Sequence, residues 1–259
     1  MMTFAKYHGS GNDFILIDDR EQKIHLVSDQ IRRMCDRHFG IGADGLILIR
    51  KSKKEDFEML YFNSDGMPGS MCGNGGRCAV AFASALGIVN SKSIFSAFDG
   101  NHQAQILSTN PFLVKLEMTD VNHIEVGDNF YLLDTGSPHF VQFRESIAKL
   151  DVVSEGRQIR NSERFNKAGV NVNFVEAGSR SISLRTYERG VENETLSCGT
   201  GITASVLAAA YSGRIIESPC EVKTSGGNLK VHFKKEGSRF YDIWLEGPAE
   251  FVFTGATQL

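Results

Sequence analysis

The sequence predicts an α+β protein with two pseudo-symmetric domains, each a mostly antiparallel sheet wrapped around a central helix. Two observations lead to this fold class. The motif Cys-Gly-x-Gly occurs at Cys72 and again at Cys198, an offset of 198 − 72 = 126, close to half of the 259 residues. An apolar helical stretch follows each motif, and strand-like runs flank both in the same order.

The offset of 126 continues beyond the two motifs. Val80 falls on Val206, Ala83 on Ala209 and Gly87 on Gly213. Matches that cluster behind the motif are much less expected by chance than scattered ones. We therefore predict domains at 1–120 and 121–249, with the strand at 250–259 a candidate to return to the first half.

Each half opens with a strand-like run, at 14–17 and at 140–143. In the first half a helix follows over 28–38, with Ser28 as the expected N-cap and Gly40 as the stop. The next apolar and β-branched runs predict the strands 46–49 and 57–62 in the first half and 172–175 and 181–187 in the second.

The two central helices are predicted at about 76–86 and 201–212. Neither carries a charged residue after Arg77, and a helix that is apolar on all sides is normally buried on all sides. Gly87 and Gly213 are natural helix ends. The remaining strands are predicted at 93–98, 102–107, 111–117, 220–224, 228–233, 241–245 and 251–253.

Composition excludes several classes of function. Hydrophobic residues make up 41% and charged residues 23%, with a net charge of -3, so we expect no nucleic-acid partner. No apolar run is long enough for a membrane span, and the first residues lack an apolar signal core. The five cysteines are an odd number, which favours a reducing compartment, and the expected location is cytoplasmic.

The two repeated cysteines are the candidate chemical groups. Each precedes a buried helix, whose first turn offers unpaired N–H groups and the positive end of the helix dipole. Such a position binds a carboxylate and lowers the pKa of a thiol. If the halves face each other, one thiolate removes a proton from a tetrahedral carbon and the other thiol delivers one to the opposite face.

The sequence fits other roles of the cysteines and glycines less well. A cysteine is often a small buried hydrophobe, which we expect for Cys35, Cys78 and Cys220, since Cys78 has Ala204 at its repeat position. The glycines after Cys72 do not match the phosphate-loop motif G-x-x-x-x-G-K-[ST]. The cysteine spacings do not suit zinc, so we expect no metal.

The chain resembles the diaminopimelate epimerase family through seven motifs in the family's order. They span residues 8–201, and so cover most of the chain. These motifs are His8-Gly9-Ser10-Gly11-Asn12-Asp13-Phe14, Gly40-Ile41-Gly42-Ala43-Asp44-Gly45, Phe62-Asn63-Ser64-Asp65-Gly66, Met71-Cys72-Gly73-Asn74-Gly75-Gly76-Arg77-Cys78, Gly136-Ser137-Pro138-His139, Tyr187-Glu188-Arg189-Gly190 and Ser197-Cys198-Gly199-Thr200-Gly201.

The resemblance implies a cofactor-independent epimerase that interconverts LL- and meso-diaminopimelate for lysine and peptidoglycan precursor synthesis. It implies that Cys72 and Cys198 are the catalytic pair, with Cys72 the base for the LL isomer and Cys198 for the meso isomer. The partners implied are a small-molecule amino-acid substrate and a second copy in a homodimer. The other implied site residues are Gly73, Asn74, Gly199 and Thr200 for the carboxylate at the reacting carbon, Asn12 near that carbon, Asn63, Asn171, Glu188 and Arg189 for the distal end, and His139 and Glu188 for tuning the thiols.

The chain departs from the family pattern in three places. Ser137 stands where many members have asparagine, and Gly45 where some have glutamine. The stretch around Glu192 is one residue longer than in many members. These departures bear on the substrate pocket rather than on the reaction type.

The sequence also allows rival interpretations. Proline-racemase-like enzymes also use two cysteines but carry Cys-Gly-His-Gly, and histidine racemases have a similar fold. Phenazine-biosynthesis isomerases share the architecture without the cysteine pair. A thiol redox or ligand-binding protein without turnover is the alternative from another class, and a stable Cys72–Cys198 disulfide in reducing buffer would favour it.

Overall fold

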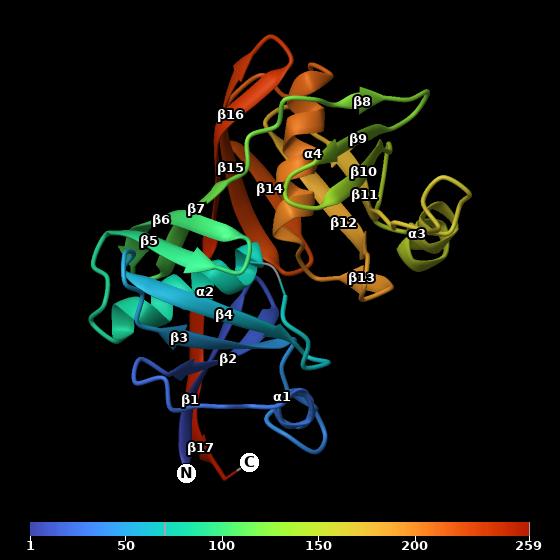
Figure 1. Ribbon diagram of the computed structural model, residues 1–259. Helices are drawn as coiled ribbons and strands as arrows, with labels where there is room; N and C mark the ends of the chain where they lie inside the picture. The colour runs from blue at the N-terminus through green and yellow to red at the C-terminus, as the bar shows by residue number, and fades with distance from the viewer. Residues whose placement is uncertain (70, 259) are drawn as a thin grey trace. The chain divides into compact units, whose positions relative to one another are not determined.

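A computed structural model describes residues 1–69 and 71–258 and divides the chain into two compact units (Figure 1). The first unit comprises Met1–Leu116 and Gly247–Leu259, and the second comprises Glu117–Glu246. Each unit is a sheet around one helix, which confirms the predicted α+β fold class. Among the helices described, none is both long and apolar enough to cross a membrane.

In the first unit eight strands pair in the order β17-β1-β2-β3-β4-β5-β6-β7. Their bounds are β1 Met2–Gly9, β2 Asn12–Asp18, β3 Gly45–Arg50, β4 Phe57–Asn63, β5 Lys92–Ala97, β6 Gly100–Thr109, β7 Phe112–Met118 and β17 Glu250–Thr257. The final strand β17 thus lies beside the first, with Met2 opposite Thr257, and the two chain ends meet in this unit (Figure 1).

In the second unit eight strands pair in the order β8-β9-β10-β11-β12-β14-β15-β16, and a short β13 adds to β12. Their bounds are β8 Glu125–Val126, β9 Tyr131–Asp134, β10 Pro138–Phe143, β11 Asn171–Ala177, β12 Ser181–Glu188, β13 Asn193–Thr195, β14 Cys220–Thr224, β15 Gly227–Glu236 and β16 Arg239–Pro248.

The two sheets have the same pairing pattern. From β17 to β7 the pairs run antiparallel, antiparallel, parallel, antiparallel, parallel, antiparallel and antiparallel. From β8 to β16 the sequence of pairings is identical. The internal repeat read from the sequence is therefore a repeat of topology.

Each sheet curves around a thirteen-residue helix, α2 (Gly73–Ala85) or α4 (Gly199–Tyr211). Helix α2 contacts β1 to β4 and β6, and α4 contacts β9 to β12, β14 and β15. All residues of α2 from Gly73 to Ala83 are buried, as the apolar sequence predicts. A helix enclosed on every side holds its first residue in a fixed place, which matters because that residue follows a cysteine.

A second helix covers the outside of each sheet: α1 (Ser28–Cys35) and α3 (Val152–Arg160). The predicted capping of α1 was wrong. Val27 is the N-cap, with its N–H bonded to the Gln30 side chain, and Ser28 is already inside the helix. The helix ends at Cys35 rather than at 38, because Asp36 turns to an extended backbone.

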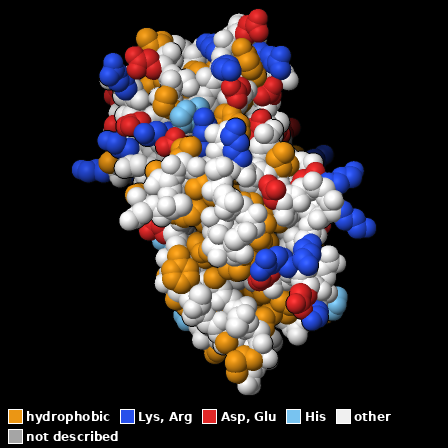
Figure 2. Space-filling view, turned by 90° about the vertical axis from the view of Figure 1, so that its left-hand side faces the viewer, with side chains coloured by type: hydrophobic (Ala, Val, Ile, Leu, Met, Phe, Trp, Pro, Cys, Tyr) orange, Lys and Arg blue, Asp and Glu red, His pale blue; other side chains and the backbone are white. Residues whose placement is uncertain are grey.

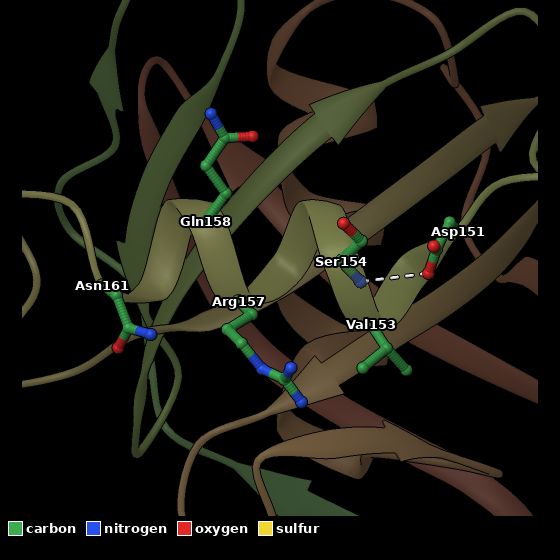
Figure 3. Close-up of a pocket in the computed structure, with 6 residues that line it drawn as sticks. All are labelled: Asp151, Val153, Ser154, Arg157, Gln158 and Asn161. Carbon is green, nitrogen blue, oxygen red and sulfur yellow. Dashed lines mark hydrogen bonds between the residues drawn. The ribbon is translucent and has the colours of Figure 1, made fainter.

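Helix α3 was not predicted. Asp151 caps it by accepting a hydrogen bond from the Ser154 N–H at 3.0 Å (Figure 3). The surface hollow drawn there, of about 580 Å³, is lined only by residues of α3 and its two caps. It contains none of the candidate site residues.

Candidate functional site

Cys72 is the N-cap residue of α2, in an extended backbone conformation. Its carbonyl accepts from the Gly76 N–H at 2.7 Å, which closes the first turn. A side chain at Gly75 would meet Ile47 and Phe14 at 3.3–3.4 Å, so glycine lets the helix start lie close to the sheet. The N–H groups of Gly73 and Asn74 then lie in the first turn, where an anion is favoured.

Asn12 lies next to this cysteine, as the resemblance implied. Its Oδ1 accepts hydrogen bonds from Asn74 Nδ2 at 3.2 Å and from Cys72 Sγ at 3.6 Å. Its Nδ2 donates to Asp44 Oδ2 at 2.7 Å. The fold thus brings together Asn12, Cys72 and Asn74 from two separate segments of the chain.

Asn63, by contrast, lies at the end of β4, opposite Gly45 in the register. Within the described part of the first unit, no hydrogen bond joins its side chain to Cys72 or Asn12. A side chain at Gly45 would meet the Tyr61 ring at 2.5 Å and the Phe62 carbonyl at 2.6 Å. Tyr61 therefore occupies the space beside Gly45, where some family members carry glutamine.

A network of charged side chains lies next to Asn12. Asp13 binds Lys6 at 2.8 Å and Arg37 at 2.8 Å, and Arg37 also binds Asp44 at 2.7 Å. Burial alone would raise the pKa of Asp13, but the hydrogen bonds from Arg37 and Lys6 outweigh it and lower the pKa to about 2. Asp13 is therefore ionised at any physiological pH.

Cys198 is the N-cap residue of α4 and repeats the setting of Cys72 in the second unit. The Ile202 N–H donates to its carbonyl at 2.8 Å. Its Sγ lies 3.5 Å from Thr200 Oγ1, and the Thr200 carbonyl accepts from Thr135 Oγ1 at 2.9 Å. The second unit thus also presents a thiol at the start of a buried helix.

Sequence reasoning missed Asn173, which is fully buried beneath α4. Its Nδ2 donates to the Phe140 carbonyl at 3.0 Å, and its Oδ1 accepts from Thr186 Oγ1 at 3.0 Å. A side chain at Gly201 would meet that Oδ1 at 2.5 Å. The second glycine of the Cys-Gly-x-Gly motif is therefore required because Asn173 lies against the helix.

Asn173 also sets the state of His139. Its Nδ2 lies 3.1 Å from His139 Nδ1, which must accept, so the ring proton sits on Nε2. Burial, with a smaller contribution from Arg189, lowers the pKa of His139 to about 3. The imidazole is neutral, and within the described residues its Nε2 has no hydrogen-bond partner.

His139 also borders a cavity of about 530 Å³ in the second unit. Most of its lining is apolar, including Leu132, Leu133, Phe165 and Val170. The ring stays neutral because it is fully buried, which makes the charged imidazole costly.

Two residues implied for the distal end of a substrate, Asn171 and Arg189, form one cluster with Ser137. Asn171 donates from Nδ2 to Ser137 Oγ at 2.9 Å, and its Oδ1 accepts from the Arg189 N–H at 2.9 Å. Arg189 Nη2 donates to Ser137 Oγ at 3.2 Å. Glu188 accepts from Thr195 Oγ1 at 2.8 Å. Ser137 Oγ therefore contacts both Asn171 and Arg189.

The other three cysteines are buried, as expected for core residues. Burial raises the pKa of Cys35 to about 12, that of Cys220 to about 11, and that of Cys78 further. In the described residues no group of three His, Cys, Asp or Glu side chains has a metal-binding arrangement.

Solved structures share the fold across the whole chain. A phenazine biosynthesis protein of the PhzF family from Bacillus anthracis matches with a TM-score of 0.78 at 13% identity, covering 100% of this chain and 99% of that one. A hydroxyproline epimerase from Agrobacterium vitis matches with a TM-score of 0.70 at 14% identity, covering 98% and 90%. At such identities the likeness shows the fold alone, a two-unit α+β fold that also occurs in epimerases.

Sequence comparison is more specific. The diaminopimelate epimerase family profile matches residues 4–124 and 131–252. Diaminopimelate epimerase from Flavobacterium psychrophilum is 48% identical over 97% of this chain and 98% of its own length, and that from Chlorobaculum tepidum is 43% identical over 97% and 99%. The chain belongs to the diaminopimelate epimerase family and is an isomerase.

Proposed function

We propose that the chain interconverts LL- and meso-diaminopimelate without a cofactor, using Cys72 and Cys198 as acid and base. The observation that carries the proposal is the repeat of one device: a cysteine as the N-cap of a buried thirteen-residue helix in each unit. Inversion at a carbon needs one proton removed from one face and one delivered to the other. Two equivalent thiols supply both groups.

Each helix start suits its thiol to this role. The unpaired N–H groups and the helix dipole favour a thiolate over a thiol and also attract a carboxylate. We assign the N–H groups of Gly73, Asn74, Gly199 and Thr200 to the carboxylate at the reacting carbon. A bound carboxylate there orients the adjacent C–H bond and spreads the charge that develops when the proton leaves.

We assign the cluster of Arg189, Asn171 and Ser137, with Asn63 and Glu188, to the distal amino-acid end. An arginine fork can bind both oxygens of a carboxylate. The exposed guanidinium of Arg189 already makes hydrogen bonds to Ala168 and Ser137, which hold it in one direction. We assign His139 and Glu188 to tuning the thiols, with His139 acting as a neutral ring.

The test measures how much deuterium enters the product and the remaining substrate. Run from LL-diaminopimelate in deuterated water and stopped early, the reaction should label the meso product at the inverted carbon, because the second thiol has exchanged with solvent. The remaining substrate should carry almost no label, because the abstracting thiol would return the original proton. Unlabelled product would indicate one base that moves a single proton. Starting from the meso isomer should give the same asymmetry.

Removing the Arg189 side chain should discriminate between substrates. Arg189→Ala is expected to lower kcat/KM for diaminopimelate by roughly tenfold to a hundredfold, the loss of a charge-assisted contact worth about 1.5–3 kcal/mol. Any weak activity on a monocarboxylate amino acid should change little. Arg164→Ala, which removes an exposed arginine paired with Glu125, is the matched control. Equal losses on both substrates would make Arg189 structural.

We also propose that the chain forms a homodimer through β17. The second edge of this strand pairs with no other described strand, and the strand carries three exposed hydrophobic side chains, Phe251, Val252 and Phe253. Figure 2 shows hydrophobic side chains exposed among polar ones on one face of the first unit. An unpaired apolar edge strand is a site for association.

Sedimentation velocity is expected to show a dimer of the unmodified chain, and Val252→Glu is expected to shift it to monomer. Ile216→Glu, which places the same charge at an exposed apolar residue of the second unit, should leave the dimer intact. A monomeric unmodified chain would contradict the assignment.

We further place the reaction in the cytoplasm, where thiols stay reduced, and its product in lysine and peptidoglycan precursor synthesis.

A further inference from the structure

A run of hydrogen-bonded polar side chains in the first unit connects a buried cation to a carboxylate. Cys72 contacts one of these side chains. Arg77 donates from Nη2 to Asn74 Oδ1 at 2.8 Å. Asn74 Nδ2 donates to Asn12 Oδ1 at 3.2 Å. Asn12 Nδ2 donates to Asp44 Oδ2 at 2.7 Å. Two amides therefore link a charged group at each end.

Both ends fix the direction of this run. A guanidinium only donates, so Asn74 must turn its oxygen toward Arg77. A carboxylate only accepts, so Asn12 must turn its nitrogen toward Asp44. An amide could otherwise exchange its oxygen and nitrogen by a flip. With both amides oriented in this way, Asn74 Nδ2 faces Asn12 Oδ1 and can donate to it. Asn12 Oδ1 is then also the atom that Cys72 Sγ contacts at 3.6 Å.

The ends are themselves held in place. Arg77 is 0% exposed, and it also donates to the carbonyls of Gly73 and Pro248, both at 3.2 Å. No carboxylate pairs with it in the part of the chain that the structure describes. Burial lowers the pKa of this guanidinium, yet an arginine keeps its proton. Asp44 accepts from Arg37 Nη2 at 2.7 Å on its other oxygen.

The second unit has no counterpart to this run. The repeat offset places Arg77 on residue 77 + 126 = 203, which is Thr203. Its hydroxyl donates to the Gly199 carbonyl at 3.0 Å, the same contact that Arg77 makes to Gly73, but without a charge. Thr200 stands in place of Asn74. The device therefore serves Cys72 alone.

We propose that Arg77 and Asp44 are positioning residues for Cys72: they hold the Asn74 and Asn12 amides in one orientation and so decide that the sulfur meets an oxygen. This inference rests on the proposed function, in which Cys72 exchanges the substrate proton. An oxygen acceptor favours the S–H form over the thiolate, and a buried cation favours the thiolate. Through orientation both residues favour the S–H form, but the charge of Arg77 favours the thiolate. Because Arg77 is fully buried, we expect its charge to outweigh its orienting effect, so that Asp44 and Arg77 have opposite net effects on Cys72.

Other charged groups beside the run in the first unit are Lys6 on β1 and Arg37 after α1, which both bind Asp13 on β2. Cys78, which follows Arg77 on α2, is protonated because burial raises its pKa. In Asp44→Asn, Arg37 loses its ion pair with Asp44 but keeps both of its bonds to Asp13.

The experiment measures the rate of Cys72 alkylation by iodoacetamide against pH, in a Cys198→Ser background and without substrate. Peptide mass identifies the modified site, and the raised pKa values of Cys35 and Cys220, about 12 and about 11, keep those thiols unreactive. Asp44→Leu should lower the apparent pKa of Cys72 by roughly half a unit to one unit, and Arg77→Gln should raise it by about one unit. If Asp44 and Arg77 only stabilised the fold, the two substitutions would not shift the pKa of Cys72 in opposite directions.

Two controls separate orientation from charge. Asp44→Asn keeps an oxygen for Asn12 while removing the charge, so it should give less than half the shift of Asp44→Leu. Asp18→Asn removes another arginine-paired carboxylate, bound to Arg20 and outside the run, and should give none.

An unchanged or raised pKa in Asp44→Leu would overturn the proposal, as would equal shifts for Asp44→Asn and Asp44→Leu. If Arg77→Gln does not fold, the Asp44 variants still test the proposal. The Asp44 side chain is 43% exposed, so replacing it should destabilise the fold little. A chain that alkylates as expected but never epimerises diaminopimelate would refute the proposed function and leave this inference standing.

Discussion

Replacing either Cys72 or Cys198 with alanine is expected to lower the rate of epimerisation by about a hundredfold to ten-thousandfold, the usual contribution of a general acid or base. In the proposed mechanism each thiol serves one face of the carbon, so the remaining one cannot compensate. The variants should stay folded, because each residue only begins its helix and makes no side-chain capping bond. Initial rates in both directions, with thermal unfolding as a check, measure this.

Cys220→Ala is the matched control, since it removes a buried thiol on β14 that the mechanism does not use. Its rate should stay near that of the unmodified chain. A Cys72 or Cys198 variant that keeps more than about a tenth of the rate, an effect below about 1.4 kcal/mol, would end the two-thiol mechanism.

The second large effect concerns stability. Asn173→Leu is expected to lower the free energy of unfolding by roughly 3 kcal/mol, because it strands buried groups that each cost about 1–3 kcal/mol when unpaired. The groups are the Phe140 carbonyl, the Thr186 hydroxyl and His139 Nδ1. Urea unfolding followed by circular dichroism gives the value.

Asn166→Leu makes the same chemical change at an exposed position of the second unit and should alter stability by less than about 0.5 kcal/mol. Equal losses in the two variants would mean that the buried amide contributes no more than a surface one. A stable Asn173→Leu variant would show that the surrounding groups find other partners.

The central helices were predictable because their sequences are unusual. A glycine-rich start followed by an uninterrupted apolar run has few alternatives to a buried helix, and its repetition 126 residues later identified the two halves. The strands around them follow from β-branched and aromatic runs. Local pattern was therefore sufficient for the fold class.

Helix α3 was missed because Gly156 lies in its middle, and glycine weakens a helix by about 1 kcal/mol. The glycine is needed, since a Cβ there would meet the Tyr187 Cβ at 2.4 Å. The repeat could nevertheless have predicted this helix. The offset places Ser28, the start of α1, on 28 + 126 = 154, inside α3.

The polar contacts of the site were out of reach for a different reason. Asn12 and Asp44 are 32 residues apart and Asn173 and His139 are 34 apart, so no local pattern pairs them. The full burial of Arg77 contradicts the usual exposure of arginine. Only the tertiary structure can show that its charge is enclosed beside a helix start.

The return of β17 to β1 has a consequence for synthesis on the ribosome. The second unit is one continuous segment, Glu117–Glu246, and can complete its sheet as soon as it has emerged. The first unit must wait for residues beyond Gly247, although most of it was made earlier, because β1 has no outer neighbour until β17 arrives. Pairing residues this distant is slow. The half synthesised first is thus the half that matures last, with its edge exposed in the meantime to other nascent chains.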